Sequence, residues 1–253
     1  MPAEIVKKAI GIKLKAIALT DHDSVEGVEG AISVAPDSIE VIPAVEMSAN
    51  IGDLDIHILG YYIDHTSDEL NTFLEDFRIY RLKRVDKILR KLSSDGINID
   101  RDHVIIISGN GSIGRPHIAE AMRQSGYVHS INEAFIRYLG YHSRYYEPKK
   151  EIKPKEVIQK IKKCKGIPVI AHPGTVGGAS MVYQLIMDGI MGIEVWHPEH
   201  TRQQESELCE TAMKNGLLMT GGSDYHGYPR SRVDMGKYGC SMEEVRRLKE
   251  TRQ

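Results

Sequence analysis

Short apolar runs alternate with longer amphipathic segments along most of the chain. The runs are four to eight residues long and rich in Val, Ile, Leu and Ala, which is typical of strands buried in a sheet. Segments with apolar residues three or four positions apart separate most of them and predict helices. This alternation predicts an α/β fold with a parallel β/α barrel or sheet. The predicted strands are 14–19, 39–46, 54–61, 166–171, 192–196 and 217–220, and the predicted helices beside them include 3–10, 24–34, 154–163 and 199–215.

The pattern changes between the third and the fourth predicted strand. Apolar residues from Leu70 to Leu92 follow a helical spacing with basic residues between them, and further helix-like segments cover 115–125 and 130–139. The run 104–107 favours a strand by propensity but lies between helix-like segments, so its structure stays open. The predicted domains are a barrel formed by residues 1–64 and 154–253, and a mostly helical insertion, residues 65–153, over the active-site mouth.

The composition is that of an ordinary globular protein with near-neutral charge. The chain has 253 residues and a formal net charge of −2, so stable DNA binding is not expected. Its three cysteines are scattered without a CxxC pair, which indicates a reduced, cytoplasmic protein. No signal peptide is recognisable, and no apolar run approaches the roughly 20 residues of a membrane span, so no membrane partner is expected. Eleven histidines against three Phe and one Trp are the unusual feature.

Potential metal ligands lie in or directly after most of the predicted strands. A single histidine near a strand is more often hydrogen-bonded filler than a ligand, but parallel strands carry their carboxyl ends to one rim, where several such side chains would converge. Mixed imidazole and carboxylate ligands suit Zn, Mn or Fe, and clustered carboxylates need a cation to offset their repulsion. The candidates are Asp21, His22, Glu46, His57, His172, His197, Asp224 and His226.

Arg115-Pro116-His117 forms a second candidate site. Glycines lead into a helix start there, and Arg and His in the first turn of a helix suit an oxyanion such as phosphate. An arginine at a helix start is often merely solvated, so the motif gains weight only if the insertion folds over the barrel mouth. The remaining histidines fall in loops or helices and are not expected to bind metal; they are His65, His103, His129, His142 and His200.

Taken together, these stretches resemble the PHP family, the polymerase and histidinol phosphatase superfamily of metal-dependent phosphoesterases. The matching motifs follow in family order and span most of the chain. The Gly-Arg-Pro-His motif resembles the subgroup that removes phosphate from nucleoside 3′,5′-bisphosphates, some members of which trim short RNA from the 5′ end. The matching stretches are Leu19–Asp23, Val45–Ser48, His57–Tyr61, Gly114–Ala119, Ala171–Gly174 and Gly222–Gly227.

The resemblance implies a distorted (β/α)7 barrel that holds up to three divalent metal ions (Mn, Zn or Fe). Glu46 would bridge two of the ions. His57 and His172 would complete one of these sites, and Asp224 would belong to the other. The remaining two histidines would serve a third ion. The implied metal ligands are His22, Glu46, His57, His172, Asp224 and His226.

The same resemblance implies a small phosphorylated substrate, either a nucleotide or the end of a short RNA. Arg115 and His117 would hold the substrate phosphate. His197 would lie at the rim or face the substrate, where it is a candidate for substrate binding, and Asp21 would support a metal ligand from behind. The residues to which the resemblance gives catalytic roles are Glu46, His57 and Asp224.

One family motif has no counterpart in the sequence as it stands. Members open with a strand bearing His-x-His and a loop bearing Ser-Asp-Gly, whereas Met1-Pro2-Ala3-Glu4 already reads as the helix that follows them. The resemblance therefore implies a barrel whose first strand is missing and which binds fewer ions. The favoured function is hydrolysis of a phosphomonoester. The alternative is an N-terminally truncated, weakly active or inactive chain that acts as a phosphate- or nucleotide-binding module.

Overall fold

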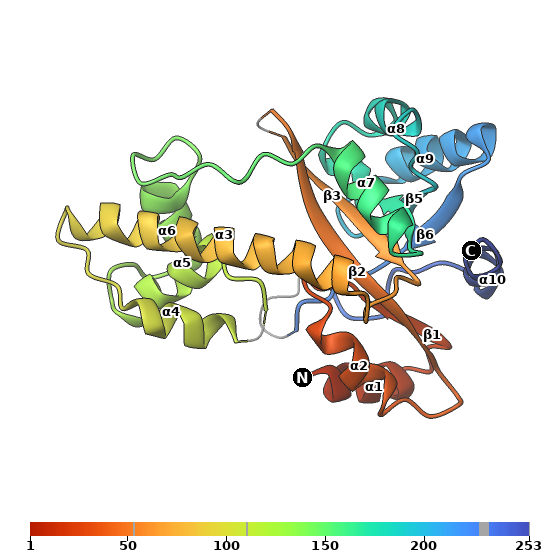
Figure 1. The fold of residues 1–253 in the computed structure, drawn as a ribbon, viewed down its shortest axis with the longest axis horizontal. Helices are drawn as coiled ribbons and strands as arrows, with labels where there is room; N and C mark the ends of the chain where they lie inside the picture. Colours follow the sequence, from red (N-terminus) through yellow and green to blue (C-terminus); the bar gives the residue numbers. More distant parts are fainter. Residues whose placement is uncertain (53, 110, 228–232, 253) are drawn as a thin grey trace. The chain divides into compact units, whose positions relative to one another are not determined.

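A single curled sheet runs through the part of the chain that carries most of the candidate ligands (Figure 1). The computed structural model describes residues 1–52, 54–109, 111–227 and 233–252. Within these residues the sheet has six strands, which lie side by side in the order of the sequence. All the predicted strands are confirmed, and the architecture is mixed α/β. The strands are β1 (Ala16–Leu19), β2 (Glu40–Ile51), β3 (Leu54–Tyr61), β4 (Ile167–Ile170), β5 (Gly192–Trp196) and β6 (Leu218–Gly221).

The direction of β3 departs from the parallel sheet that the sequence predicts. β1 pairs with β2 in parallel, as β4 does with β5 and β5 with β6, but β3 runs antiparallel to both of its neighbours. The reason is the connection: β2 continues to Ile51 and β3 begins at Leu54, so only residues 52 and 53 join them. A parallel crossover needs about a dozen residues or more, so a two-residue link can only form a hairpin.

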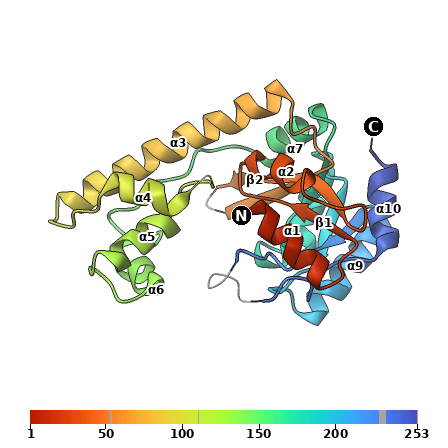
Figure 2. The same cartoon turned by 90° about the horizontal axis from the view of Figure 1, so that it is seen from below.

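Helices cover the sheet in the expected strand–helix alternation. α7 packs on β2, β3 and β4, α9 packs on β5 and β6, and α2 lies against β1 and β2. α1 contacts α2, and the two lie side by side in Figure 2. α10, which has no counterpart among the predicted elements, packs on β6. These helices are α1 (Pro2–Gly11), α2 (Glu26–Ile32), α7 (Pro154–Lys163), α8 (Ala179–Ile186), α9 (Arg202–Asn215) and α10 (Met242–Glu250).

Local sequence explains where these helices begin and end. α7 starts with Pro154 in its first turn, where the missing N–H costs nothing, and buries Val157, Ile158 and Ile161. At the start of α9, Thr201 accepts a hydrogen bond from the backbone N–H of Gln204. Gly216 ends the same helix in a left-handed conformation (φ +64°) that suits glycine. The apolar residues that α7 buries therefore lie on the helix that packs on β2, β3 and β4.

The predicted insertion is helical throughout its regular elements. Residues 104–107, whose structure the sequence leaves open, belong to α4. Asp100 caps this helix through the backbone N–H of Asp102, and Val104 is buried in the core formed with α3 and α5. Capping and burial thus override the strand propensity of the isoleucines. The elements are α3 (Asp68–Ser93), α4 (Arg101–Ser108), α5 (Arg115–Gln124), α6 (Ile131–Ala134) and a π-helical turn η1 (Phe135–Leu139).

The chain divides into two compact units. The sheet unit comprises Met1–Asn71 and Glu151–Gln253, and the helical unit comprises Thr72–Lys150. The helical unit has its own apolar core, which includes Val85, Ile88 and Met122. That the insertion covers the active-site mouth stays a prediction. In the described part of the chain, none of the helices combines the length and the apolar composition needed to cross a membrane.

Candidate active site

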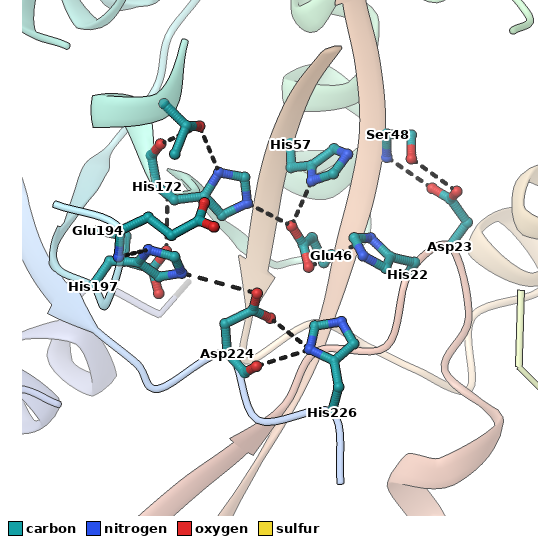
Figure 3. Close-up of polar contacts among 12 residues, drawn as sticks. His22, Asp23, Glu46, Ser48, His57, His172, Glu194, His197, Asp224 and His226 are labelled. Carbon is teal, nitrogen blue, oxygen red and sulfur yellow. Dashed lines mark hydrogen bonds and ion pairs between the residues drawn. The ribbon is translucent and has the colours of Figure 1, made fainter. Parts of the chain in front are cut away.

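Glu46 lies at the centre of the candidate ligands and contacts three histidines (Figure 3). Its Oε1 lies 2.8 Å from Nδ1 of His57 and 3.2 Å from Nε2 of His172. Its Oε2 lies 3.4 Å from Nδ1 of His22. The two oxygens of one carboxylate therefore face histidines that come from three separate parts of the sheet.

The antiparallel direction of β3 explains how a histidine in the middle of a strand reaches this cluster. His57 pairs with Ser48, two residues beyond Glu46 on β2. On the other side, the carbonyl of His57 accepts the N–H of Ala171, which directly precedes His172. The middle of β3 therefore lies beside the carboxyl end of β4. Beyond the end of β1, His22 forms a single parallel bridge with Glu46.

The histidines keep Glu46 ionised. Burial on its own would raise the pKa of Glu46, but the nearby charges of His22 and His57 and the hydrogen bond from His172 hold this pKa well below its usual range. For His172, burial works in the opposite sense and favours the neutral ring, yet the contact with Glu46 raises its pKa to about 9. Glu46 is therefore an ionised carboxylate at the centre of the cluster, and its histidine partners offset its charge.

The donor set fits a divalent metal ion. One ligand atom each from His22, Glu46 and His57 lies within 4.8 Å of the others. Ligands that bind one tetrahedral ion at about 2.0–2.2 Å stand roughly 3.4 Å apart. Nδ1 of His57 is buried and has no hydrogen-bond partner among the described residues, although it lies only 2.8 Å from Glu46. A cation held between these two atoms would satisfy the lone pairs of both.

The loop after β6 brings a second carboxylate to the same rim. Oδ2 of Asp224 lies 4.0 Å from Nε2 of His197, and Oδ1 lies 3.4 Å from Nδ1 of His226. The rings of His226 and His22 have centroids 6.2 Å apart, and those of His197 and His172 are 5.2 Å apart. The structure therefore brings all the predicted metal ligands and His197 together. We name this set the rim cluster; it consists of His22, Glu46, His57, His172, His197, Asp224 and His226.

His197 presents a hydrogen-bond donor to the rim. Its Nδ1 accepts the backbone N–H of Glu199 at 3.2 Å. Burial, together with the nearby charges of His172 and His200, lowers the pKa of His197 to about 4. The ring is therefore neutral and carries its proton on Nε2. This buried Nε2 has no hydrogen-bond partner within the described ranges, and it faces Asp224 across the rim.

Three of the six residues other than glycine that have a positive φ in the described part of the chain lie in the loops that carry candidate ligands. Asp23, His172 and Asp224 each adopt a left-handed conformation, with φ of 50°, 31° and 46°. Such conformations are costly for residues other than glycine and persist where the surrounding structure fixes them, often at functional sites. Each of the three residues follows a strand of the sheet, where the chain must turn to present the ligands.

Arg115 and His117 lie in the first turn of α5, within the helical unit. Arg115 is buried and its Nη1 donates a hydrogen bond to the carbonyl of Leu139 at 2.9 Å. Its guanidinium also lies 4.6 Å from the centroid of the Tyr141 ring. Nδ1 of His117 accepts the N–H of Gly114, which closes the start of the helix. The phosphate-binding role of these two residues stays a prediction.

A second buried arginine accompanies Arg115. Arg84 on α3 is 6% exposed, and its Nε donates to the carbonyl of Glu147 at 2.9 Å. Its Nη2 is buried without a hydrogen-bond partner among the described residues. Both guanidinium groups lie near the ring of Tyr146, at 5.8 and 5.3 Å from its centroid. Burial and the charge of Arg115 lower the pKa of Arg84. We name Arg84 and Arg115 the arginine pair.

Comparison with known proteins identifies the family. A 5′-3′ exoribonuclease from Haemophilus influenzae is 31% identical over 93% of this chain and 88% of its own length. A 3′,5′-nucleoside bisphosphate phosphatase from Chromobacterium violaceum is 30% identical over 93% of this chain and 85% of its own length. The chain belongs to the PHP family of metal-dependent phosphoesterases. These relatives are hydrolases, as the resemblance predicts.

Solved structures agree with this assignment. A crystal structure from Bifidobacterium adolescentis, described as a metal-dependent phosphoesterase, superposes on this PHP chain with a TM-score of 0.88 at 29% identity. The match covers 98% of this chain and 90% of the other. No family model matches the chain.

The sequence leaves Glu194 in the sheet unit and Arg84 in the helical unit unassigned. Glu194 on β5 is buried and accepts the N–H of His172 at 2.9 Å, and burial raises its pKa to about 8. An acid inside an otherwise apolar strand was the available signal. Arg84 lies seven residues after Phe77, on the apolar stripe of α3. A charged residue at a position where the pattern expects an apolar one could have marked Arg84 as buried. Asp21, expected behind a ligand, uses its carbonyl to accept the N–H of Glu46.

Proposed function

We propose that this chain is a metal-dependent phosphoesterase that acts on the phosphomonoester of a small nucleotide, of the nucleoside 3′,5′-bisphosphate type, or on the 5′ end of a short RNA. The names of the two relatives support this substrate class. The similarity to phosphoesterase structures supports the fold of a distorted (β/α)7 barrel to which the curled sheet would correspond.

The observation that carries the proposal is the Glu46 carboxylate with histidines on both of its oxygens. A carboxylate approached from two sides can bind one ion with each oxygen, and the imidazoles complete the ligand sets. Divalent ions bound there would lower the pKa of a water molecule and offset the charge that develops on the phosphate oxygens. The residues that would hold them are His22, Glu46, His57, His172, Asp224 and His226.

Other residues of the rim cluster would act on the substrate directly. The neutral ring of His197 carries a proton on Nε2, and a phosphate oxygen is a strong acceptor for such a donor. The carboxylate of Asp224 lies between His197 and His226 and would keep both rings turned toward the rim. Pre-positioned donors of this kind stabilise the transition state because they need not reorganise during the reaction.

The arginine pair supports a phosphate-binding role for the helical unit. Two guanidinium groups share the ring of Tyr146, and neither forms an ion pair with a carboxylate among the described residues. Burying unpaired positive charge is costly unless an anion binds it. A phosphate group offers several acceptor oxygens that match the planar fork of an arginine. We therefore assign substrate phosphate binding to Arg115 and His117, with Arg84 beside them.

Phosphate release from adenosine 3′,5′-bisphosphate in the presence of Mn²⁺ tests the proposal. We expect hydrolysis by the wild-type chain and a loss of more than about 100-fold in Glu46→Gln, since even residues that only support a metal ligand contribute 10- to 100-fold. Glu210→Gln, which changes an exposed glutamate paired with Lys214, is the matched control and should retain activity. Equal rates in wild type and Glu46→Gln would refute the proposal, as would tight nucleotide binding without hydrolysis at full Mn²⁺ occupancy.

A further inference from the structure

Asp23, the residue after His22, is bound to β2 through both oxygens of its carboxylate (Figure 3). Oδ1 accepts the backbone N–H of Ser48 at 2.7 Å, and Oδ2 accepts the hydroxyl of the same serine at 3.0 Å. Asp23 is 5% exposed and Ser48 is 7% exposed. Buried carboxylates that accept two hydrogen bonds hold their position firmly, because breaking either bond would leave a buried charge unsatisfied.

The backbone on both sides of His22 is attached to Glu46. The N–H of Asp23 donates to the carbonyl of Glu46 at 2.8 Å, and the N–H of Glu46 donates to the carbonyl of Asp21 at 3.2 Å. Regular pairing of β1 ends at Leu19, so these bonds continue the ladder by one bridge beyond the strand. The side chain of Asp23 secures the outer end of this extension. His22 is thus held between two points fixed to β2.

The conformation of Asp23 fits this role. Its φ of 50° turns the chain so that its carboxylate points back at β2, and Asp and Asn tolerate this left-handed region better than most other residues. The side chain of His22 itself is 36% exposed, against 18% for His57 and His172. Its orientation therefore depends on its backbone more than theirs does.

We propose that Asp23 is a positioning residue, which acts through His22 and keeps its Nδ1 beside Oε2 of Glu46. The inference rests on the proposed function in one respect, because it takes His22 to be a metal ligand. Asp23 binds no metal in this account, since both of its carboxylate oxygens are engaged by Ser48. Its contribution is to hold His22 ready, so that the ligand set need not form anew when the ion binds.

Calorimetric titration of the metal-free chain with Mn²⁺ tests this role without relying on activity. We expect Asp23→Ala to weaken the Mn²⁺ site that His22→Ala weakens, by about 10- to 100-fold. Asp23→Asn should stay within about threefold of wild type, because the amide can accept from the Ser48 N–H and donate to its hydroxyl. Because Asp23 acts through His22, Asp23→Ala should add nothing to a chain that already carries His22→Ala.

Asp64→Ala is the matched control. Asp64 also accepts both the N–H and the hydroxyl of one residue, Thr66, but follows β3 at the end opposite the rim cluster. The Asp64→Ala chain should bind Mn²⁺ with the affinity of wild type. Urea unfolding checks that each variant is folded.

The outcomes separate this inference from the proposed function. If His22→Ala weakens Mn²⁺ binding while Asp23→Ala does not, the positioning role is wrong and the metal site stands. If His22→Ala has no effect, His22 is not a ligand and the positioning role fails, whereas the proposed function is still decided by the Glu46→Gln comparison. An effect of Asp23→Ala that persists in full in the His22→Ala background would show that Asp23 acts in another way.

Discussion

The rim cluster and the arginine pair both bury charge, but only the rim cluster surrounds its charged group with groups of opposite charge. In the rim cluster, Glu46 is surrounded by histidines that offset its charge, and a metal ion that binds these rings would displace the protons they carry. The arginine pair buries two like charges beside one tyrosine ring, without a carboxylate among the described residues. In our proposal, one site would therefore provide ligands for a cation, and the other would provide donors for an anion. Hydrolysis of a charged phosphate ester requires both kinds of group.

Metal removal is expected to have the largest effect on activity, and it should show whether the two sites bind their ions independently. Dialysis against EDTA should abolish phosphate release from adenosine 3′,5′-bisphosphate, and Mn²⁺ should restore it. Inorganic phosphate should still raise the free energy of unfolding of the metal-free chain, because the arginine pair does not depend on the metal. Urea titrations with and without phosphate measure this. A phosphate effect that disappears with the metal would place anion binding at the rim cluster alone.

Arg115→Met should weaken substrate binding. A hydrogen bond to a charged group contributes about 1.5–3 kcal/mol, so KM should rise by about 10- to 150-fold. The value of kcat should change much less, because the rim cluster is intact. Steady-state kinetics with the bisphosphate measures both constants. Arg123→Met is the control, since Arg123 lies on the same helix but is exposed and paired with Glu120; a fall in kcat with unchanged KM would contradict the assignment.

Arg84→Met should weaken phosphate binding without destabilising the fold. Replacing a buried charge that lacks a carboxylate partner with an apolar side chain of similar length removes a desolvation cost, so the free energy of unfolding should stay constant or rise by about 1 kcal/mol. Stabilisation by inorganic phosphate should decrease in the same variant. Urea unfolding tests both, with Arg78→Met as an exposed control. A loss of about 2 kcal/mol or more would mean that Arg84 is a structural residue.

Glu147→Gln should change the free energy of unfolding by the smallest amount among these variants. The hydrogen bond and charge of Lys91 lower the pKa of Glu147 despite the opposing effect of burial. Because the folded-state pKa is lowered, the stabilisation is present above the unfolded pKa and is lost as the pH falls through the folded value. We expect the variant to lose about 0.2–1 kcal/mol at pH 7 and to match wild type once the pH is well below the folded-state pKa of Glu147. If the variant remained less stable than wild type by the same amount at low pH, the stabilisation would not come from the ionised Glu147 paired with Lys91.

The sequence predicts the strands well, because apolar runs mark β1 to β6. It also predicts that His22, His172 and Asp224 lie close together, because each follows a parallel strand and these strand ends share a rim. The direction of β3 could not be predicted, since β2 continues through polar residues to Ile51 and conceals the hairpin.

Partners that are distant in sequence account for the remaining differences. Arg84 is recognisable only once residues near Glu147 and Tyr146 pack against α3, and Asp23 only once Ser48 lies beside it. The helix over 104–107 likewise depends on the burial of Val104 in the core of the helical unit. Tertiary packing, rather than local propensity, decides each of these features.

Titration of the metal-free chain with Mn²⁺ by calorimetry tests the central claim most directly, because it measures whether Glu46 organises a metal site. The account predicts saturable binding by the wild-type chain and by Glu210→Gln, and a loss of affinity of more than about 100-fold in Glu46→Gln. Equal Mn²⁺ affinity in the wild-type and Glu46→Gln chains would contradict it.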